Sequence, residues 1–376
     1  MTAAGPPLSA SGADGAGASL IGRSRAELAE LLVDLGEPPA RAVMRARQLW
    51  HWLYQRGARD FAAMTSLPGA LRARLAERCE IARPTVALEQ RSSDGTRKWL
   101  LRFADGQQVE SVFIPDAGRG ALCLSTQVGC SLTCSFCHTG TMPLARNLRA
   151  DEIVSQLLIA RDALGEWPAP AGARRLSHLV VMGMGEPLLN YAQTARALRI
   201  AIDPDGLAFP RRKITLSTSG VVPQIEACGR ELGVGLAVSL HAVRDDLRDR
   251  LVPINRKWNI AALLEACRRY AASGAGRPIT FEYVMLDGIN DSDADARELV
   301  RLIRGIPAKV NLIPFNSWPG AAYRCASPER IRAFAAIVAR AGYPAPVRTP
   351  RGPDILAACG QLKTASARQR RLAVAA

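Results

Sequence analysis

The sequence is poor in aromatic residues and contains no long apolar run, and each shortage excludes a class of protein. Aromatic residues make up only 5% of the 376 residues, so the core must consist mainly of Leu, Val, Ile and Ala. No run of about 18 apolar residues is present to span a bilayer. Residues 1–20 lack the basic and apolar segments of a secretory signal. We therefore expect a cytoplasmic protein with no membrane partner.

Acidic residues are also too few to balance the basic ones. Lys and Arg number 49 against 34 Asp and Glu, which gives a formal net charge of +15. A surface this basic attracts polyanions, so nucleic acid is the leading expected partner; a solvated basic surface without such a partner is the alternative. The length suggests two or three structural units.

The amino-terminal part of the chain changes composition along its length. Residues 1–23 are mainly Gly, Ala, Ser and Pro and cannot bury enough apolar surface to fold, so a disordered leader is predicted. Residues 24–82 are predicted to form a helical accessory domain, because Ser24 and Glu27 have capping-box spacing and leucines follow at helical intervals. This Arg-rich domain could contact RNA or serve only as a packing module.

Two patterns follow in the rest of the chain. Residues 83–115 alternate as a β-hairpin with a turn at Asp105-Gly106, which would link the helical domain to the next unit. Residues 116–345 contain six apolar strand-like runs, each followed by a helical stretch. The predicted strands are 121–127, 176–182, 213–217, 235–240, 279–285 and 309–315. The predicted helices are 150–164, 191–202, 222–232, 260–273, 293–303 and 328–341.

Six βα units are two short of a closed eightfold barrel. The predicted fold class is therefore α/β, an incomplete (β/α)6 barrel that is open on one side. Residues 346–376 are predicted to form a carboxy-terminal loop with a basic tail. Another basic run, Arg211, Arg212 and Lys213, precedes the third strand and could contact a phosphate or lie in a solvated loop.

Three of the nine cysteines are clustered after the first predicted strand. Cys130, Cys134 and Cys137 form a C-x3-C-x2-C run, and the loops at the carboxyl ends of barrel strands are where reactive groups gather. Three thiolates can ligate three irons of a four-iron cluster and leave the fourth iron open to a chelating molecule. The alternative is a structural zinc site, but zinc requires four ligands, and His138 is poorly placed to be the fourth.

These residues resemble a known superfamily. The cysteine run, with Phe136 before its last member, matches the signature of radical-SAM enzymes. Longer motifs resemble the RlmN family of RNA methyltransferases, and the similarity covers residues 24–365. These motifs are at residues 129–130, 137–140, 146–148, 182–190, 216–223, 239–242 and 357–362.

The resemblance implies an activity and its cofactors. Enzymes of this family methylate C2 of one adenosine in 23S rRNA, at the peptidyl-transferase centre, and in many bacteria C2 of the adenosine 3′ of the anticodon in tRNAs. The implied cofactors are a [4Fe-4S] cluster on Cys130, Cys134 and Cys137, and S-adenosylmethionine, two molecules per turnover. The cluster cleaves the second molecule to a 5′-deoxyadenosyl radical. An electron donor such as flavodoxin would serve the cluster, and we expect a monomer.

The resemblance also implies roles for single residues. Cys359 would carry the methyl group, Cys123 would release the product by forming a disulfide with Cys359, and Glu110 would accept the C2 proton. Read without the resemblance, Cys123 could be a buried core thiol and Glu110 a paired surface carboxylate. The implied S-adenosylmethionine contacts are Gly185, Glu186, Ser217, Ser239, Leu240, His241 and Asn316. His241 could instead be a strand-end histidine held by a backbone carbonyl.

Three rival functions differ in what they require. A Cfr-type enzyme methylates C8 of the same adenine with the same cysteines, so the catalytic residues cannot separate the two, and the whole-chain match favours C2. A methylthiotransferase would need a second three-cysteine cluster towards the amino end, where only Cys79 and Cys123 lie. A non-enzymatic iron–sulfur or zinc protein that binds RNA would need neither Cys123 nor Cys359.

Overall fold

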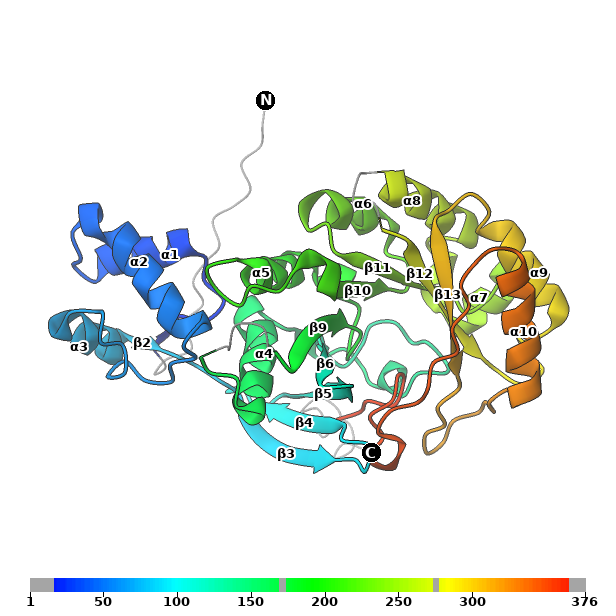
Figure 1. Cartoon of the computed structure of the whole chain (residues 1–376), viewed down its shortest axis with the longest axis horizontal. Helices are drawn as coiled ribbons and strands as arrows, with labels where there is room; N and C mark the ends of the chain where they lie inside the picture. Colours follow the sequence, from blue (N-terminus) through cyan, green and yellow to red (C-terminus); the bar gives the residue numbers. More distant parts are fainter. Residues whose placement is uncertain (1–16, 169–173, 273–276, 365–376) are drawn as a thin grey trace.

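The predicted half-open barrel is confirmed, and it is part of a larger sheet. The computed structural model describes residues 17–168, 174–272 and 277–364. One sheet has nine strands in the order β13-β12-β11-β10-β9-β6-β5-β4-β3. Its first six strands are parallel and form the barrel wall (Figure 1). They are β6 (Arg119–Cys123), β9 (Leu176–Val181), β10 (Ile214–Thr218), β11 (Gly235–Ser239), β12 (Ile279–Met285) and β13 (Ala308–Pro314).

The helices that follow the barrel strands begin at the predicted residues and end within one residue of the prediction where the end is described. They are α4 (Ala150–Leu164), α5 (Tyr191–Ile202), α6 (Val222–Glu231), α8 (Ile260–Ala272), α9 (Asp293–Leu302) and α10 (Pro328–Arg340). The predicted last residue of α8, Ser273, lies outside the described residues. A short charged helix, α7 (Asp245–Leu251), precedes α8 and was not predicted. No helix among the described residues has the length and apolar composition needed to cross a bilayer.

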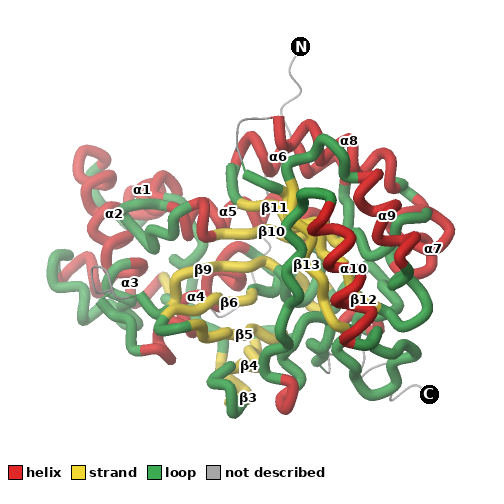
Figure 2. Tube along the Cα trace, turned by 45° about the vertical axis from the view of Figure 1, so that its right-hand side comes forward, coloured by secondary structure: helices red, strands yellow, loops and turns green. Residues whose placement is uncertain are grey.

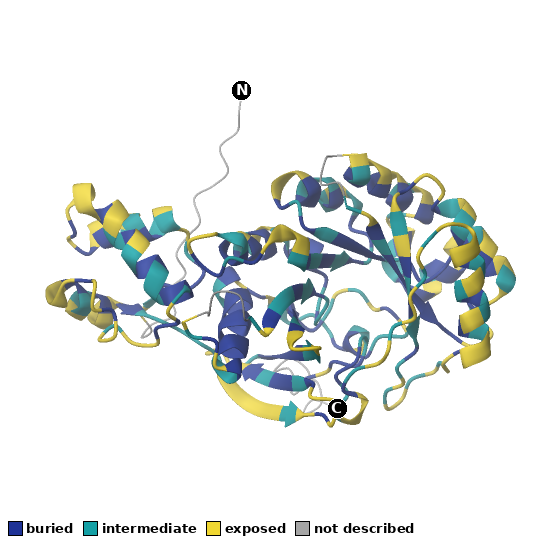
Figure 3. Cartoon of the chain, viewed as in Figure 1, coloured by how far each residue is buried: buried dark blue, intermediate teal, exposed yellow. Residues whose placement is uncertain are grey.

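The predicted hairpin forms, but it is not a separate linker. Strands β4 (Arg97–Arg102) and β5 (Gln108–Asp116) flank the expected turn, and an unpredicted strand, β3 (Thr85–Arg91), joins them. Strand β5 pairs antiparallel with β6, so all three strands continue the barrel sheet (Figure 2). Strand β3 is the exposed edge of the sheet (Figure 3). Its side chains are mostly exposed, so its sequence lacks the alternation of apolar and polar residues that would have predicted a strand.

The first barrel strand ends earlier than predicted. It stops at Cys123, and Gln127, predicted as its last residue, lies in β7 (Gln127–Val128), which pairs with β8 (Arg146–Asn147). The chain leaves the sheet near Ser125, whose hydroxyl donates to the Glu110 carbonyl oxygen at 2.6 Å and accepts from the Met184 N–H at 2.9 Å. The β7–β8 pair closes the base of the loop that carries the three clustered cysteines.

The helical unit forms as predicted, and it contacts α4 and α5 of the barrel. It contains α1 (Arg25–Asp34), α2 (Pro39–Tyr54) and α3 (Gly69–Arg78), and β1 (Ala18–Ser19) pairs with β2 (Cys79–Glu80) beside them. The capping box is confirmed: Ser24 Oγ accepts from the Glu27 N–H at 3.2 Å, and Glu27 Oε2 accepts from the Ser24 N–H at 2.7 Å. The same Glu27 carboxylate pairs with Arg196 of α5 at 2.6 Å, which joins the unit to the barrel.

The predicted disordered leader is too long at its carboxyl end. Residues 1–16 lie outside the described residues, but residues 17–23 are packed against the helical unit. Leu20 and Ile21 are buried, and the Gly22 N–H donates to the Tyr54 hydroxyl at 3.1 Å. These two apolar side chains supply the burial that the residues before them lack.

The carboxy-terminal segment covers the free edge of the barrel sheet before it reaches the barrel mouth. The N–H groups of Val310 and Leu312 in β13 donate to the carbonyl oxygens of Pro344 and Pro346 at 2.9 Å, and the Arg348 N–H donates to Leu312 at 2.8 Å. The chain then turns back towards the strand ends, as the red trace of Figure 1 shows. The predicted basic tail from residue 365 onward lies outside the described residues.

Replacing Ser24 with Ala should lower the free energy of unfolding by about 1 kcal/mol, because the capping box loses its side-chain acceptor. Urea denaturation followed by circular dichroism measures this change. Glu30→Ala, an exposed position on the same helix, is the control. Equal stability of the Ser24→Ala protein and the wild type would contradict the account of this cap.

Candidate active site

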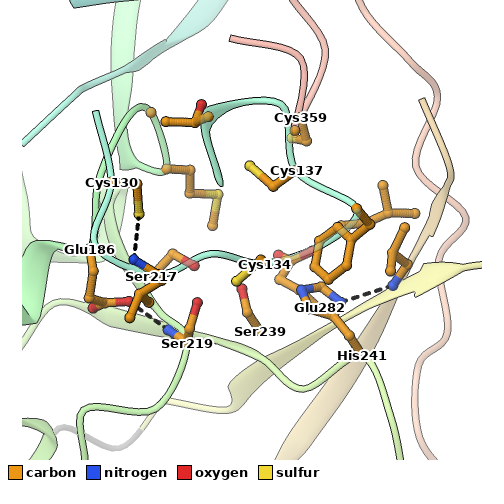
Figure 4. Close-up of a pocket in the computed structure, with 18 of the residues that line it drawn as sticks. Cys130, Cys134, Cys137, Glu186, Ser217, Ser219, Ser239, His241, Glu282 and Cys359 are labelled. Atoms are coloured by element: carbon orange, nitrogen blue, oxygen red, sulfur yellow. Dashed lines mark hydrogen bonds between the residues drawn. The ribbon is translucent and has the colours of Figure 1, made fainter. Parts of the chain in front are cut away.

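One pocket at the carboxyl ends of the barrel strands collects most of the predicted site residues (Figure 4). Each strand end delivers small or polar side chains to it, as expected where the βα loops of a barrel converge. The predicted residues that line it are Cys130, Cys134, Cys137, Gly185, Glu186, Ser217, Ser239, His241, Asn316 and Cys359. Segments far apart in the sequence therefore meet at one site.

The three clustered cysteines point into this pocket from one loop. Gly129 begins the loop with φ +78°, and a Cβ there would lie 2.2 Å from the Pro143 carbonyl oxygen, so the sharp turn requires glycine. The Cys137 N–H donates to the Cys134 carbonyl oxygen at 3.1 Å. Burial raises the pKa of all three thiols, so metal binding here must release protons.

The arrangement of donors fits a multi-iron cluster better than a zinc ion. Among the described residues, no three His, Cys, Asp or Glu side chains converge closely enough to hold a single metal ion. The three thiols line one shared cavity instead, which suits a cluster that each thiolate reaches at a different iron. His138 is engaged elsewhere: its ring stacks on Trp318 with centroids 4.6 Å apart, and its Nδ1 lies 3.2 Å from the Gln361 carbonyl oxygen.

Glu186 is a buried carboxylate at the wall of the pocket. It accepts hydrogen bonds from the N–H groups of Ser219, at 2.8 Å, and Leu188, at 3.1 Å. Burial raises the pKa of Glu186 to about 7. Gly185 before it has φ +94°, and a Cβ there would lie 2.5 Å from the Gln127 side chain. The Gln127 amide oxygen in turn accepts from the Glu186 N–H at 2.9 Å, which orients the turn.

The residues at the end of β11 are placed differently from one another. The side chain of Leu240 lies in the hydrophobic core and does not line the pocket, whereas Ser239, the last residue of β11, and His241, with φ +59°, do line it. His241 is held by a backbone N–H rather than a carbonyl: its Nδ1 accepts from Val284 at 3.0 Å. Burial lowers the pKa of His241 to about 3, so the ring is neutral and its Nε2 carries the proton.

Arg248 of α7 organises the loops after β10 and β11, and sequence reasoning missed it. Its fully buried guanidinium donates to the carbonyl oxygens of Ser219 at 2.8 Å and of Ser239 and Leu240 at 2.9 Å. A fourth bond reaches Asn255 Oδ1 at 2.9 Å. Nothing in the charged segment around Arg248 separates it from solvated arginines, so the sequence carries no signal of this role.

The loop with Cys359 is fastened to the loop with the three clustered cysteines. The His138 N–H donates to the Gly360 carbonyl oxygen at 2.7 Å, and the Thr139 hydroxyl donates to Leu362 at 2.6 Å. From the other side, Asn316 Nδ2 donates to the Cys359 carbonyl oxygen at 3.1 Å. The thiol of Cys359 is thereby held beside Cys137 at the edge of the pocket (Figure 4).

A second, adjoining cavity brings Cys123 and Cys359 together. Cys123 is the last residue of β6, and both thiols are free and line this cavity. Burial and the neighbouring Cys359 raise the pKa of Cys123 to about 12. The side chain of Arg348, which lines both cavities, lies in the field of both sulfurs and of Glu282. The second cavity is therefore where the two predicted catalytic thiols are in reach of each other.

Glu110 is buried, so its alternative as a paired surface carboxylate is wrong. It pairs with the buried Lys98 ammonium at 3.0 Å and accepts from the Lys363 N–H at 2.9 Å. Burial raises the pKa of Glu110, and the Lys98 charge opposes that shift. Its side chain is absent from the described linings of both cavities. Through its hydrogen bond with the Lys363 N–H, Glu110 links β5 to the segment that follows Cys359.

Comparison with known proteins gives consistent results over nearly the whole chain. Residues 124–300 match the Radical SAM superfamily, and residues 18–81 match the ribosomal RNA large subunit methyltransferase N-terminal domain. Proteins named "Dual-specificity RNA methyltransferase RlmN" are 60% identical in Rhodospirillum rubrum and 59% in Gluconobacter oxydans. Each alignment covers 94% of this chain, with 82% and 87% of the respective relatives.

A solved structure supports the same relationship. The crystal structure of a radical SAM methyltransferase from Sphaerobacter thermophilus is 48% identical to this chain and superposes with a TM-score of 0.85. The match covers 92% of this chain and 99% of that protein. The similarity therefore extends to the helical unit and the carboxy-terminal loop as well as the barrel.

Arg248→Gln should weaken S-adenosylmethionine binding at least tenfold and destabilise the protein by about 3 kcal/mol, because buried carbonyl oxygens of two pocket loops lose their donor. Equilibrium dialysis with the cluster-reconstituted protein and urea denaturation measure the two effects. Arg250→Gln, at an exposed position on the same helix, is the matched control. Wild-type affinity in the Arg248→Gln protein would show that Arg248 does not shape the pocket.

Proposed function

This chain belongs to the RlmN family of radical-SAM RNA methyltransferases, and we propose that it methylates C2 of an adenosine in 23S rRNA and of the adenosine 3′ of the anticodon in tRNAs. Its superfamily implies a [4Fe-4S] cluster and S-adenosylmethionine as cofactors. The observation that carries the proposal is the convergence of the clustered cysteines, Cys123 and Cys359 on two adjoining cavities.

The first cavity would hold both cofactors. Cys130, Cys134 and Cys137 would ligate the cluster, which supplies the electron that cleaves S-adenosylmethionine. The Glu186 carboxylate, buried beside Gly185, would pair with the methionine ammonium group, and the resulting ion pair would offset the cost of its burial. The remaining polar groups that could bind the nucleoside and carboxylate are those of Ser217, Ser239, His241 and Asn316.

Cys359 would serve as a methyl carrier between the two cavities. Its sulfur would attack the methyl carbon of one S-adenosylmethionine, displace S-adenosylhomocysteine, lose its proton and become a thioether. The 5′-deoxyadenosyl radical from a second S-adenosylmethionine would then take a hydrogen atom from that S-methyl group. The resulting carbon radical would bond to C2 of the adenine, and the adduct would give up one electron, for which the cluster is the acceptor. This covalent route answers a chemical constraint, because the electron-poor C2 cannot attack a methyl sulfonium directly.

Cys123 would then free the modified base. Its sulfur would attack the Cys359 sulfur, form a disulfide and break the bond between Cys359 and the transferred carbon, which keeps the electron pair and takes up a proton to become the methyl group on C2. The high pKa that burial imposes on Cys123 keeps it protonated in the resting protein, so a proton must leave as the attack begins. A thiol reductant must then restore both thiols. We propose that an electron donor such as flavodoxin serves the cluster, and that the working unit is a monomer.

Glu110 would accept the proton that C2 loses. Its buried position raises its pKa and makes the carboxylate a stronger base than an exposed one. In the structure it accepts instead from the Lys363 N–H, four residues after Cys359. We therefore propose that RNA binding shifts this segment and frees the carboxylate for the base.

Cys123→Ala should form a covalent protein–RNA adduct and release no product, because the sulfur that breaks the last bond is missing. The measurement is denaturing gel electrophoresis of reconstituted enzyme with labelled RNA, with mass spectrometry of the released nucleosides. Cys228→Ala, a core cysteine of α6, is the control and should turn over normally. Normal turnover by Cys123→Ala would contradict the disulfide step.

The same nucleoside analysis separates the rival functions. The wild-type protein should yield 2-methyladenosine; 8-methyladenosine as the main product would support the Cfr-type alternative. A protein that only binds RNA would yield neither and would be indifferent to Cys359→Ala. The purified protein should also carry about four irons per chain if the cluster is present.

Glu110→Gln should allow methyl transfer to Cys359 but slow product formation at least a hundredfold, because the amide keeps the volume of the side chain and removes the base. Single-turnover assays with the pre-methylated protein measure the rate. Glu89→Gln, at an exposed position on edge strand β3 of the same sheet, is the control. An unchanged rate would remove Glu110 from the mechanism.

A further inference from the structure

The second cavity extends well beyond the two catalytic thiols, along the inner face of the barrel. Arg119, Gly120, Ala121 and Cys123 line it from β6. From β9, His178 lines the same cavity. At about 3.3 Å per residue, the Cα of Arg119 lies about 13 Å from that of Cys123, towards the amino end of the strand. The cavity therefore runs from the thiols to the opposite end of the barrel wall.

More cationic than acidic side chains line this cavity. Arg119, Lys213, Arg348 and Arg351 line the cavity, and in the described part of the chain none of the four forms an ion pair with a carboxylate. Arginines elsewhere do so: Arg146 and Arg149, for example, pair with acidic neighbours at 2.6–2.8 Å. The described lining of the cavity includes one carboxylate, Asp116.

Lys213 is held in place by a neutral group. Its ammonium nitrogen lies 2.9 Å from His178 Nε2, and His178 Nδ1 lies 2.9 Å from the Ser177 hydroxyl. An ammonium group can only donate, so Nε2 must be the acceptor and the imidazole must be neutral. Burial, Lys213 and Arg119 all lower the pKa of His178, in agreement with this state. The histidine therefore orients Lys213 without cancelling its charge.

The basic run before β10 is divided by the structure. Arg211 donates to the Leu232 carbonyl oxygen, and Arg212 is exposed and is not among the residues that line the cavity. Lys213 alone of the three faces the cavity, because β9 and β10 pair Ile214 with Leu179 and so place Lys213 beside His178. A merely solvated basic loop would not direct one member of the run inward and hold it there.

We propose that Arg119 and Lys213, with His178 as a positioning residue for Lys213, bind a backbone phosphate of the RNA strand that delivers its adenosine to Cys123 and Cys359. The inference rests on the proposed function, since it places the substrate of that same site. A base must leave its stack to reach a buried thiol, and phosphate contacts then fix the register of the strand. The unpaired cations at the far end of the thiol cavity supply such a contact.

Binding of a labelled single-stranded RNA containing the target adenosine, measured by fluorescence anisotropy over a range of KCl concentrations, tests this site. For reconstituted Lys213→Ala protein, the slope of log K against log salt should be shallower, and for the Arg119→Ala/Lys213→Ala double variant it should be shallower by about 0.7, which corresponds to the loss of one phosphate contact. The KM for RNA should rise with kcat unchanged. Lys213→Arg should restore the wild-type slope.

Arg212→Ala is the matched control, because it removes the same charge one residue away but outside the cavity. It should leave the slope and the KM unchanged. An unchanged slope in Lys213→Ala, or an equal loss in Arg212→Ala, would overturn the phosphate site. Iron content and Cys359 methylation should stay at wild-type levels in every variant, and a fall in either for Lys213→Ala would assign Lys213 to the fold instead.

The two proposals fail in different ways. If the wild-type protein forms no 2-methyladenosine, the proposed function is wrong whatever the salt slopes are. If it forms 2-methyladenosine while Lys213→Ala retains the wild-type slope and KM, only the phosphate site is wrong.

Discussion

The site depends on hydrogen bonds to backbone carbonyl oxygens that fasten the carboxy-terminal loop to the loop of clustered cysteines and to the end of the barrel sheet. Residues 357–364 contain no regular element, so their own conformation would not place a thiol accurately. The bonds from His138, Thr139 and Asn316 supply that placement, and each begins on a residue beside a barrel strand end or within the cysteine loop. The rigid sheet therefore sets the position of Cys359, although more than two hundred residues separate it from Cys137.

Buried charged side chains also fix the positions of loops inside the barrel. A guanidinium or carboxylate away from water is tolerated only when its hydrogen-bonding groups are satisfied. Arg248 meets this condition by binding three loop carbonyls, and Glu186 by accepting from two N–H groups. In both cases the partners belong to the loops that form the cofactor pocket. The hydrogen bonds that stabilise each buried charge therefore also fix the shape of the site.

The sequence was sufficient for features set by local patterns and insufficient for those set by long-range contacts. Helix starts such as Ala150 and Tyr191 follow from periodicity, and the cysteine loop follows from spacing and family resemblance. The role of Arg248 could not be predicted, because it arises when α7 packs beneath two loops from other strands. Strand β3, the early end of β6 and the core position of Leu240 were missed for the same reason: pairing partners and side-chain direction are tertiary properties.

The arrangement of the two cavities suits the protein-bound methyl carrier that we propose. The first cavity lies at the carboxyl ends of the barrel strands, whereas the second extends along β6 towards Arg119 and Lys213. Cys359 lines both, and so does Arg348, which brings a positive charge to the boundary. A single thiol that lines both cavities can be reached from each of them. In the proposed reaction, a carbon carried on Cys359 would therefore let a bulky RNA substrate and the cofactor react without occupying the same space.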